Sequence, residues 1–76
     1  MEVIDARGLR CPMPLLRARR LLSTATPGEV VQIWATDLGA PADFEAYCAQ
    51  AGHELIGVER EAGSPEFFKI TLAKSS

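Results

Sequence analysis

The strongest constraint on the fold of this chain is the order in which strand-like and helix-like segments follow one another. Short β-branched or alternating segments are typical of strands, and apolar residues spaced three or four apart are typical of an amphipathic helix. Turns rich in glycine and proline separate the segments. The pattern predicts strands at 2–6, 29–36, 53–61 and 66–73, and helices at 12–23 and 42–51.

This strand-helix-strand-helix-strand-strand order predicts an α+β fold. Right-handed crossovers make the first three strands parallel, whereas the tight turn at 62–65 makes the last two antiparallel. Both helices then cover one face of a mixed four-stranded sheet, in a two-layer α/β sandwich of βαβαββ order. A length of 76 residues fits one domain over 1–76. The loops at 7–11 and 37–41 share the edge where open α/β sheets usually place their chemistry.

Cys11 is the residue with the clearest chemical character. If the first helix begins at Pro12, Cys11 is its N-cap, a position that usually holds Ser, Thr, Asp or Asn. The helix dipole, together with Arg10 and Arg7, then favours the thiolate and lowers the pKa of Cys11. The shift is expected to be moderate because Pro12 and Pro14 have no N–H to donate to the sulfur. The two prolines restrict the backbone, so Cys11 is expected on a rigid, exposed segment.

The second cysteine, Cys48, is expected to have a structural role. Cys48 lies on the apolar stripe of the second helix and is expected in the core. Two cysteines 37 positions apart are expected to be free thiols in a reducing compartment. A zinc site needs more ligands than Cys11, Cys48 and His53, a haem site lacks a second ligand, and a Cys–His dyad would have to span two edges. We therefore predict no metal and no cofactor.

Charge is distributed unevenly along the chain, whose net charge is −2. Residues 1–26 hold five arginines and two acids, whereas residues 27–76 hold three bases and eight acids. The first helix therefore presents a basic face formed by Arg17, Arg19 and Arg20, unless these are simply solvated side chains. No signal peptide and no apolar run of about 20 residues is found, so we expect a cytoplasmic protein without membrane association.

The segment 5–14, Asp-Ala-Arg-Gly-Leu-Arg-Cys-Pro-Met-Pro, resembles the Cys-Pro-x-Pro signature of the TusA/SirA/YedF sulfur-carrier proteins. The resemblance continues through 27–29, 35–37, 43–44 and 52–55, and so covers nearly the whole chain. Leu38 departs from the proline that the family often has after the Asp. Residues that match the motif around the cysteine are Gly8, Arg10, Pro12 and Pro14.

The resemblance implies a sheet of strand order 1-2-4-3. It also implies that Cys11 accepts sulfur as a persulfide from a cysteine desulfurase or a rhodanese and relays it to an acceptor protein. The destinations in the family are 2-thiouridine in tRNA, molybdenum-cofactor assembly and sulfur oxidation. Such a carrier is classed as a sulfurtransferase if it is counted as an enzyme.

The partners of a carrier are proteins, so it needs a docking surface in place of a substrate pocket. Arg17, Arg19 and Arg20 are expected to attract acidic partners, with Asp37 as a contact of opposite sign across the edge. We expect a monomer. One alternative is a nucleic-acid-binding or regulatory module that uses the same arginines on phosphates, with Trp34 as a stacking platform; the net charge of −2 disfavours direct nucleic-acid binding. A thiol oxidoreductase is a third alternative, but it lacks a Cys-x-x-Cys partner.

Overall fold

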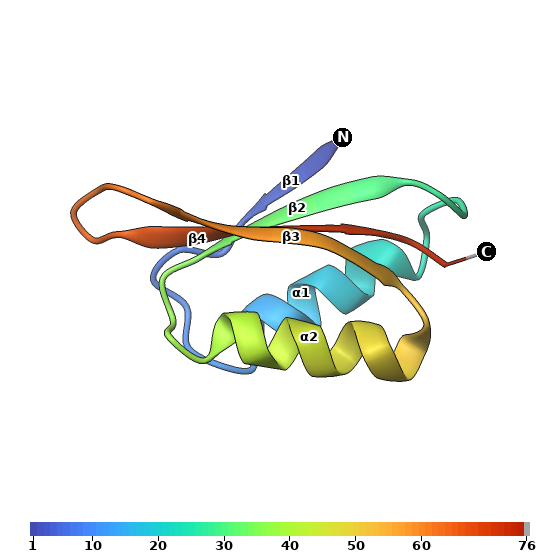
Figure 1. The fold of residues 1–76 in the computed structure, drawn as a ribbon, viewed down its shortest axis with the longest axis horizontal. Coiled ribbons are helices and arrows are strands. Elements are labelled where there is room, and N and C mark those ends of the chain that lie inside the picture. The colour runs from blue at the N-terminus through green and yellow to red at the C-terminus, as the bar shows by residue number, and fades with distance from the viewer. Residues whose placement is uncertain (76) are drawn as a thin grey trace.

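The protein is described by a computed structural model over residues 1–75, and its elements follow the predicted order (Figure 1). Their bounds, in chain order, are β1 (Glu2–Asp5), α1 (Met13–Leu22), β2 (Val30–Ala35), α2 (Ala40–Ala51), β3 (Glu54–Glu61) and β4 (Phe67–Ala73). Each strand is one or two residues shorter than the pattern predicts, which is the usual uncertainty at element ends. Neither helix in this part of the chain is long and apolar enough to cross a membrane.

The four strands form one mixed sheet in the order β1-β2-β4-β3. β1 runs parallel to β2, and β4 runs antiparallel to both β2 and β3. Both helices lie on the same face of the sheet, so the molecule has two layers (Figure 1). The predicted α/β sandwich and the strand order implied by the family resemblance are confirmed.

The core lies between the two helices and the covered face of the sheet. Ile33 at the centre of β2 pairs in register with Ile70 of β4, and both are fully buried. Alternate residues of β4 face the core: Ile70 and Leu72 are buried, and Phe68 packs against it. Phe44 of α2 is the largest fully buried side chain, and burying such a side chain contributes about 1.5–3 kcal/mol.

Helix α1 begins one residue later than predicted. The first carbonyl in its hydrogen-bond ladder is that of Pro12, which accepts from the amide of Leu16 at 3.0 Å. Pro12 is therefore the N-cap residue, and Cys11 precedes the helix. The prediction that Cys11 is the N-cap is wrong.

Helix α2 begins two residues earlier than predicted, at Ala40. The amide of Asp43 donates to the carbonyl of Gly39 at 3.1 Å, so Pro41 lies in the first helical turn, where the absence of an N–H costs nothing. The helix ends as predicted at Gly52, whose φ of 80° is the left-handed conformation that glycine adopts freely. Ala51, the last residue of the helix, is exposed.

Candidate functional site

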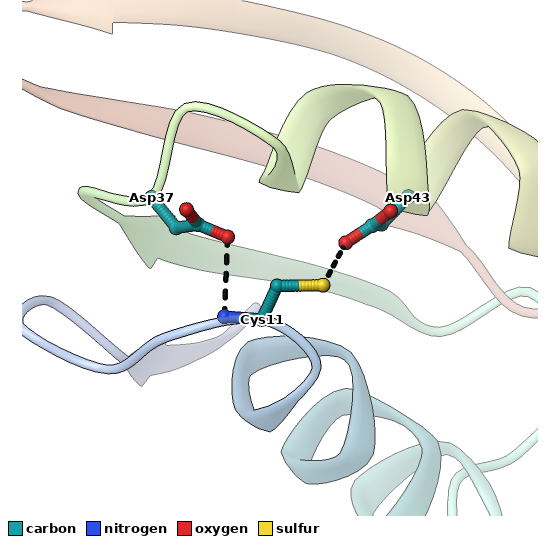
Figure 2. Close-up of side chains that lie close together, drawn as sticks. All are labelled: Cys11, Asp37 and Asp43. Atoms are coloured by element: carbon teal, nitrogen blue, oxygen red, sulfur yellow. Dashed lines mark hydrogen bonds between the residues drawn. The ribbon is translucent and has the colours of Figure 1, made fainter.

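Cys11 lies at the edge of the sheet where β1 and β2 end, as the topology predicts. It precedes α1, and its neighbours come from the segment that follows β2 and from the first turn of α2 (Figure 2). Asp37 and Asp43 point toward the cysteine from these two places. Three segments that are distant in the sequence therefore meet around one exposed thiol.

Two carboxylates make hydrogen bonds with Cys11. The thiol donates to Oδ2 of Asp43, with 2.5 Å between sulfur and oxygen. The backbone amide of Cys11 donates to Oδ2 of Asp37 at 3.1 Å. Asp37 therefore holds the backbone of the cysteine, and Asp43 holds its side chain.

These contacts raise the pKa of the Cys11 thiol above its ordinary value. The largest cause is the hydrogen bond to Asp43, followed by partial loss of solvent and by the negative charges of Asp43 and Asp37. A carboxylate accepts a hydrogen bond from the protonated thiol, but it repels the thiolate. The protonated form of Cys11 is therefore favoured. The prediction that the pKa of Cys11 is lowered is wrong.

The helix start and the arginines do not lower the pKa of Cys11, because the charged groups that shift it are carboxylates. The amide of Met13, which lies between the two prolines, donates to the carbonyl of Arg10 at 2.8 Å and not to the sulfur. Arg7 forms an ion pair with Asp5 at 2.8 Å, which lowers the pKa of Asp5 to about 2. Arg10 is exposed on the loop.

Arg7 also covers an aromatic pair on the open face of the sheet. Its guanidinium lies 5.0 Å from the ring centroids of both Trp34 and Phe67, and the ammonium of Lys69 lies 5.4 Å from that of Trp34. Trp34 is half-buried. The ring considered as a stacking platform therefore lies beside two cationic side chains, Arg7 and Lys69.

The glycine of the motif shapes the loop that carries the cysteine. Gly8 has a φ of 84°, which an L-residue with a side chain rarely adopts. Its amide donates to Oγ1 of Thr36 at 2.9 Å and so ties the loop to the residue that follows β2. Two prolines follow the cysteine closely: Pro12 is the N-cap residue of α1, and Pro14, in the first turn of that helix, is buried. Gly8, Pro12 and Pro14 thus shape the backbone around the thiol.

The three arginines of α1 do not form one face. Arg17 and Arg20 line an open groove between α1 and β1 together with the apolar side chains of Met13 and Leu16. Arg19 lies on the other side of the helix, between α1 and α2, with its guanidinium 5.9 Å from the ring centroid of Tyr47. The prediction of a single basic face is wrong, since residues 17 and 19 point in nearly opposite directions on a helix of 3.6 residues per turn.

The remaining candidate residues lie away from the thiol. Cys48 is a free thiol in the core with 3% of its surface exposed, as predicted. His53 follows α2 at the far end of the helix from Asp43, about 15 Å along the axis by helical rise. Its two ring nitrogens contact the hydroxyl of Tyr47 at 3.2 Å and the amide of Ser75 at 2.9 Å. His53 is therefore positioned by its own neighbours and not by Cys11.

Cys11, Asp37 and Asp43 each present one donor atom, and these atoms lie within 4.8 Å of one another. They are the one such group of three within residues 1–75. The set combines a soft thiol with two hard carboxylates, which different metals prefer, and the thiol and Asp43 already bind each other. We interpret the group as a hydrogen-bonded cluster around the cysteine. Asp43 was not predicted as a site residue. The available signals were its match to the family resemblance at 43–44 and its place at the start of the second helix, at the same sheet edge as Cys11.

The chain is similar to proteins of a known family. The family model described as Sulfurtransferase TusA matches residues 2–74. A protein of Allochromatium vinosum named sulfur carrier protein TusA is 42% identical over 66 residues, which cover 87% of this chain and 87% of that protein. A relative in Neisseria meningitidis serogroup B is 47% identical over 62 residues, covering 82% of this chain and 84% of its own.

The fold has a similar solved structure as well. A SirA-like protein from Desulfitobacterium hafniense aligns over the full length of both chains with a TM-score of 0.77. The two sequences are 22% identical, so this likeness concerns the fold alone.

Proposed function

The chain belongs to the TusA family of sulfur carriers, and from that premise we propose that it carries sulfur as a persulfide on Cys11. The observation that supports the proposal most directly is the position of this thiol. Cys11 is exposed on a stiff loop at the sheet edge, whereas Cys48 is buried in the core. A protein partner can reach the first and not the second.

The proposed reaction exchanges one sulfur–sulfur bond for another. The Cys11 sulfur attacks the terminal sulfur of a cysteine persulfide on a donor protein, for which we propose a cysteine desulfurase or a rhodanese. The new bond joins this sulfur to Cys11, the bond within the donor breaks, and the Cys11 proton passes to the departing donor thiolate. No net oxidation occurs and no cofactor is required. Transfer to an acceptor protein repeats the exchange, with the acceptor thiol as the attacking group.

The surroundings of Cys11 suit protein partners. Leu38, which follows Asp37, has 82% of its surface exposed, and Met13, two residues after the cysteine, has 43% exposed. Large exposed apolar side chains beside a reactive group are typical of an interaction site. We propose that this rim contacts donor and acceptor in turn, with Asp37 at its centre as a partner contact.

The arginines of α1 supply the charge for docking. Arg17 and Arg20 flank an apolar groove, and Arg19 lies beside the other groove of the same helix. We propose that these side chains attract partners with acidic surfaces. Charges at the rim of an interface mainly change the rate of encounter and its dependence on salt.

The proposal is tested by weighing the intact protein after incubation with a cysteine desulfurase and cysteine. Wild type and Cys48→Ser are expected to gain the mass of one sulfur atom, which a reducing agent removes. Cys11→Ser is expected to gain none. Loading that survives in Cys11→Ser would refute persulfide carriage on Cys11. Relatives named sulfur carriers support this role, and the experiment tests which atom performs it.

A further inference from the structure

The thiol and the carboxylate that bind each other come from opposite sides of the site. Cys11 lies in the loop before α1, and Asp43 lies in the first turn of α2, 32 residues later. Figure 2 shows the two side chains pointing at each other across the gap between these segments. Phe44, the next residue along the chain, is fully buried and fixes this turn of α2 against the core. The carboxylate is therefore held in place by the fold.

The contact between the two groups requires a proton. A thiolate in contact with a carboxylate oxygen would place two negative charges side by side, so the hydrogen bond between Cys11 and Asp43 is one in which the thiol donates. Asp37 adds a second negative charge within 4.8 Å. Arg19 lines the same groove as Asp43, but no cation is among the groups that shift the pKa of Cys11. Both carboxylates raise the pKa of Cys11 accordingly.

A carrier exposes its cysteine to every small reagent in solution as well as to its partners. The thiolate is the form that reacts with oxidants and alkylating agents. A thiol kept protonated is therefore protected in the free protein, as long as docking removes the protection. A partner that offers its own N–H or cationic group to the carboxylate would compete with the thiol for the same oxygen and release it.

We propose that Asp43 is a specificity-determining residue that keeps Cys11 protonated in the free carrier and releases it when a partner binds the carboxylate. This inference rests on the proposed function, since it assumes that Cys11 is the sulfur-carrying group. The released proton passes to the departing donor thiolate, so the transfer balances as before. Asp43 would thus make Cys11 selective for partners over small reagents.

The test compares two reactions of Cys11 in the same variants. Alkylation by iodoacetamide is followed against pH and quantified at Cys11 by peptide mass, and sulfur loading from a cysteine desulfurase is followed by intact mass. Asp43→Asn keeps the size of the side chain and removes its charge. We expect its alkylation profile to move to lower pH, with about tenfold faster alkylation at pH 7 for a move of about one pH unit. Loading is expected to gain less, so that the ratio of loading to alkylation falls several-fold.

Two further variants separate this role from a purely structural one. Asp43→Glu retains a carboxylate and is expected to restore most of the wild-type alkylation profile. Asp37→Asn removes a carboxylate that binds the backbone amide, and it is expected to move the profile less than Asp43→Asn does. Urea denaturation of each variant establishes that it is folded.

Three outcomes would overturn the proposal. The first is an Asp43→Asn profile that coincides with wild type or lies at higher pH. The second is an equal gain in alkylation and loading, which would mean that Asp43 still lowers the reactivity of Cys11 when a partner is bound. The third is a ratio that rises. Absence of loading on wild-type Cys11 would instead refute the proposed function, and the alkylation profiles would still decide whether Asp43 holds the proton.

Discussion

The two cysteines of this protein share a raised pKa for different physical reasons. For Cys11 the main cause is a hydrogen bond to the Asp43 carboxylate, whereas for Cys48 it is burial in the core. A hydrogen bond to a surface carboxylate is lost when another donor takes its place, but burial is lost only when the fold opens. The same direction of shift therefore describes a thiol that can be switched on and a thiol that cannot.

Helix α2 connects the two regions. Its first turn presents Asp43 to the site, and the next positions along its inner face, Phe44 and Cys48, are buried against the sheet. The packing of the core therefore determines where the carboxylate stands. A change in the core is expected to disturb the site, whereas a change at the exposed thiol is expected to leave the core intact.

The largest expected contrast is in the accessibility of the two thiols. In the native protein, iodoacetamide is expected to modify Cys11 readily. Cys48 is expected to react slower by a factor on the order of 10³ or more, because its modification requires an opening of the fold that costs several kcal/mol. In denaturant the two rates are expected to become similar. Peptide mass after timed quenching measures both rates. Equal modification of the two cysteines in the native protein would contradict the core position of Cys48.

The second contrast is in stability. Cys48→Ser places a hydroxyl among apolar side chains and is expected to lower the free energy of unfolding by about 1–3 kcal/mol. Cys11→Ser is expected to change it by no more than about 0.5 kcal/mol, because the residue is exposed and a serine hydroxyl can still donate to Asp43. Urea denaturation of the two variants measures both values. A larger loss for Cys11→Ser would mean that the site contributes to the fold.

The smallest contrast is between two arginines near the thiol. Arg10→Ala is expected to leave the alkylation profile of Cys11 unchanged, because carboxylates and not arginines are the charges that shift its pKa. Arg19→Ala is expected to slow sulfur loading by a few-fold at low salt and to have no effect near 1 M salt, where charges are screened within about 3 Å. Loading rates at two salt concentrations and the two pH profiles measure this. A shifted profile for Arg10→Ala would restore the arginine as a source of thiol activation.

Local patterns along the sequence determined most of the fold and the identity of the reactive residue. Apolar spacing and the turns at glycine and proline predict all six elements in the right order, because burial on one face leaves a period in the sequence. The right-handed crossover rule then places the loop of Cys11 at the correct sheet edge. Cys48 is recognised as a core residue for the same reason. These features depend on neighbours within a few positions along the chain.

The tertiary structure alone decided the electrostatic state of the thiol. Sequence neighbours of Cys11 are arginines and a helix start, which predict a lowered pKa, whereas its neighbours in space are Asp37 and Asp43, which raise it. Both carboxylates are more than 25 residues away along the chain. The pairing of Arg7 with Asp5 and the separation of Arg17 from Arg19 likewise follow from side-chain packing. Charge interactions depend on distances of a few ångströms between side chains. The periodic patterns of the sequence do not predict which side chains, distant along the chain, the packing brings that close.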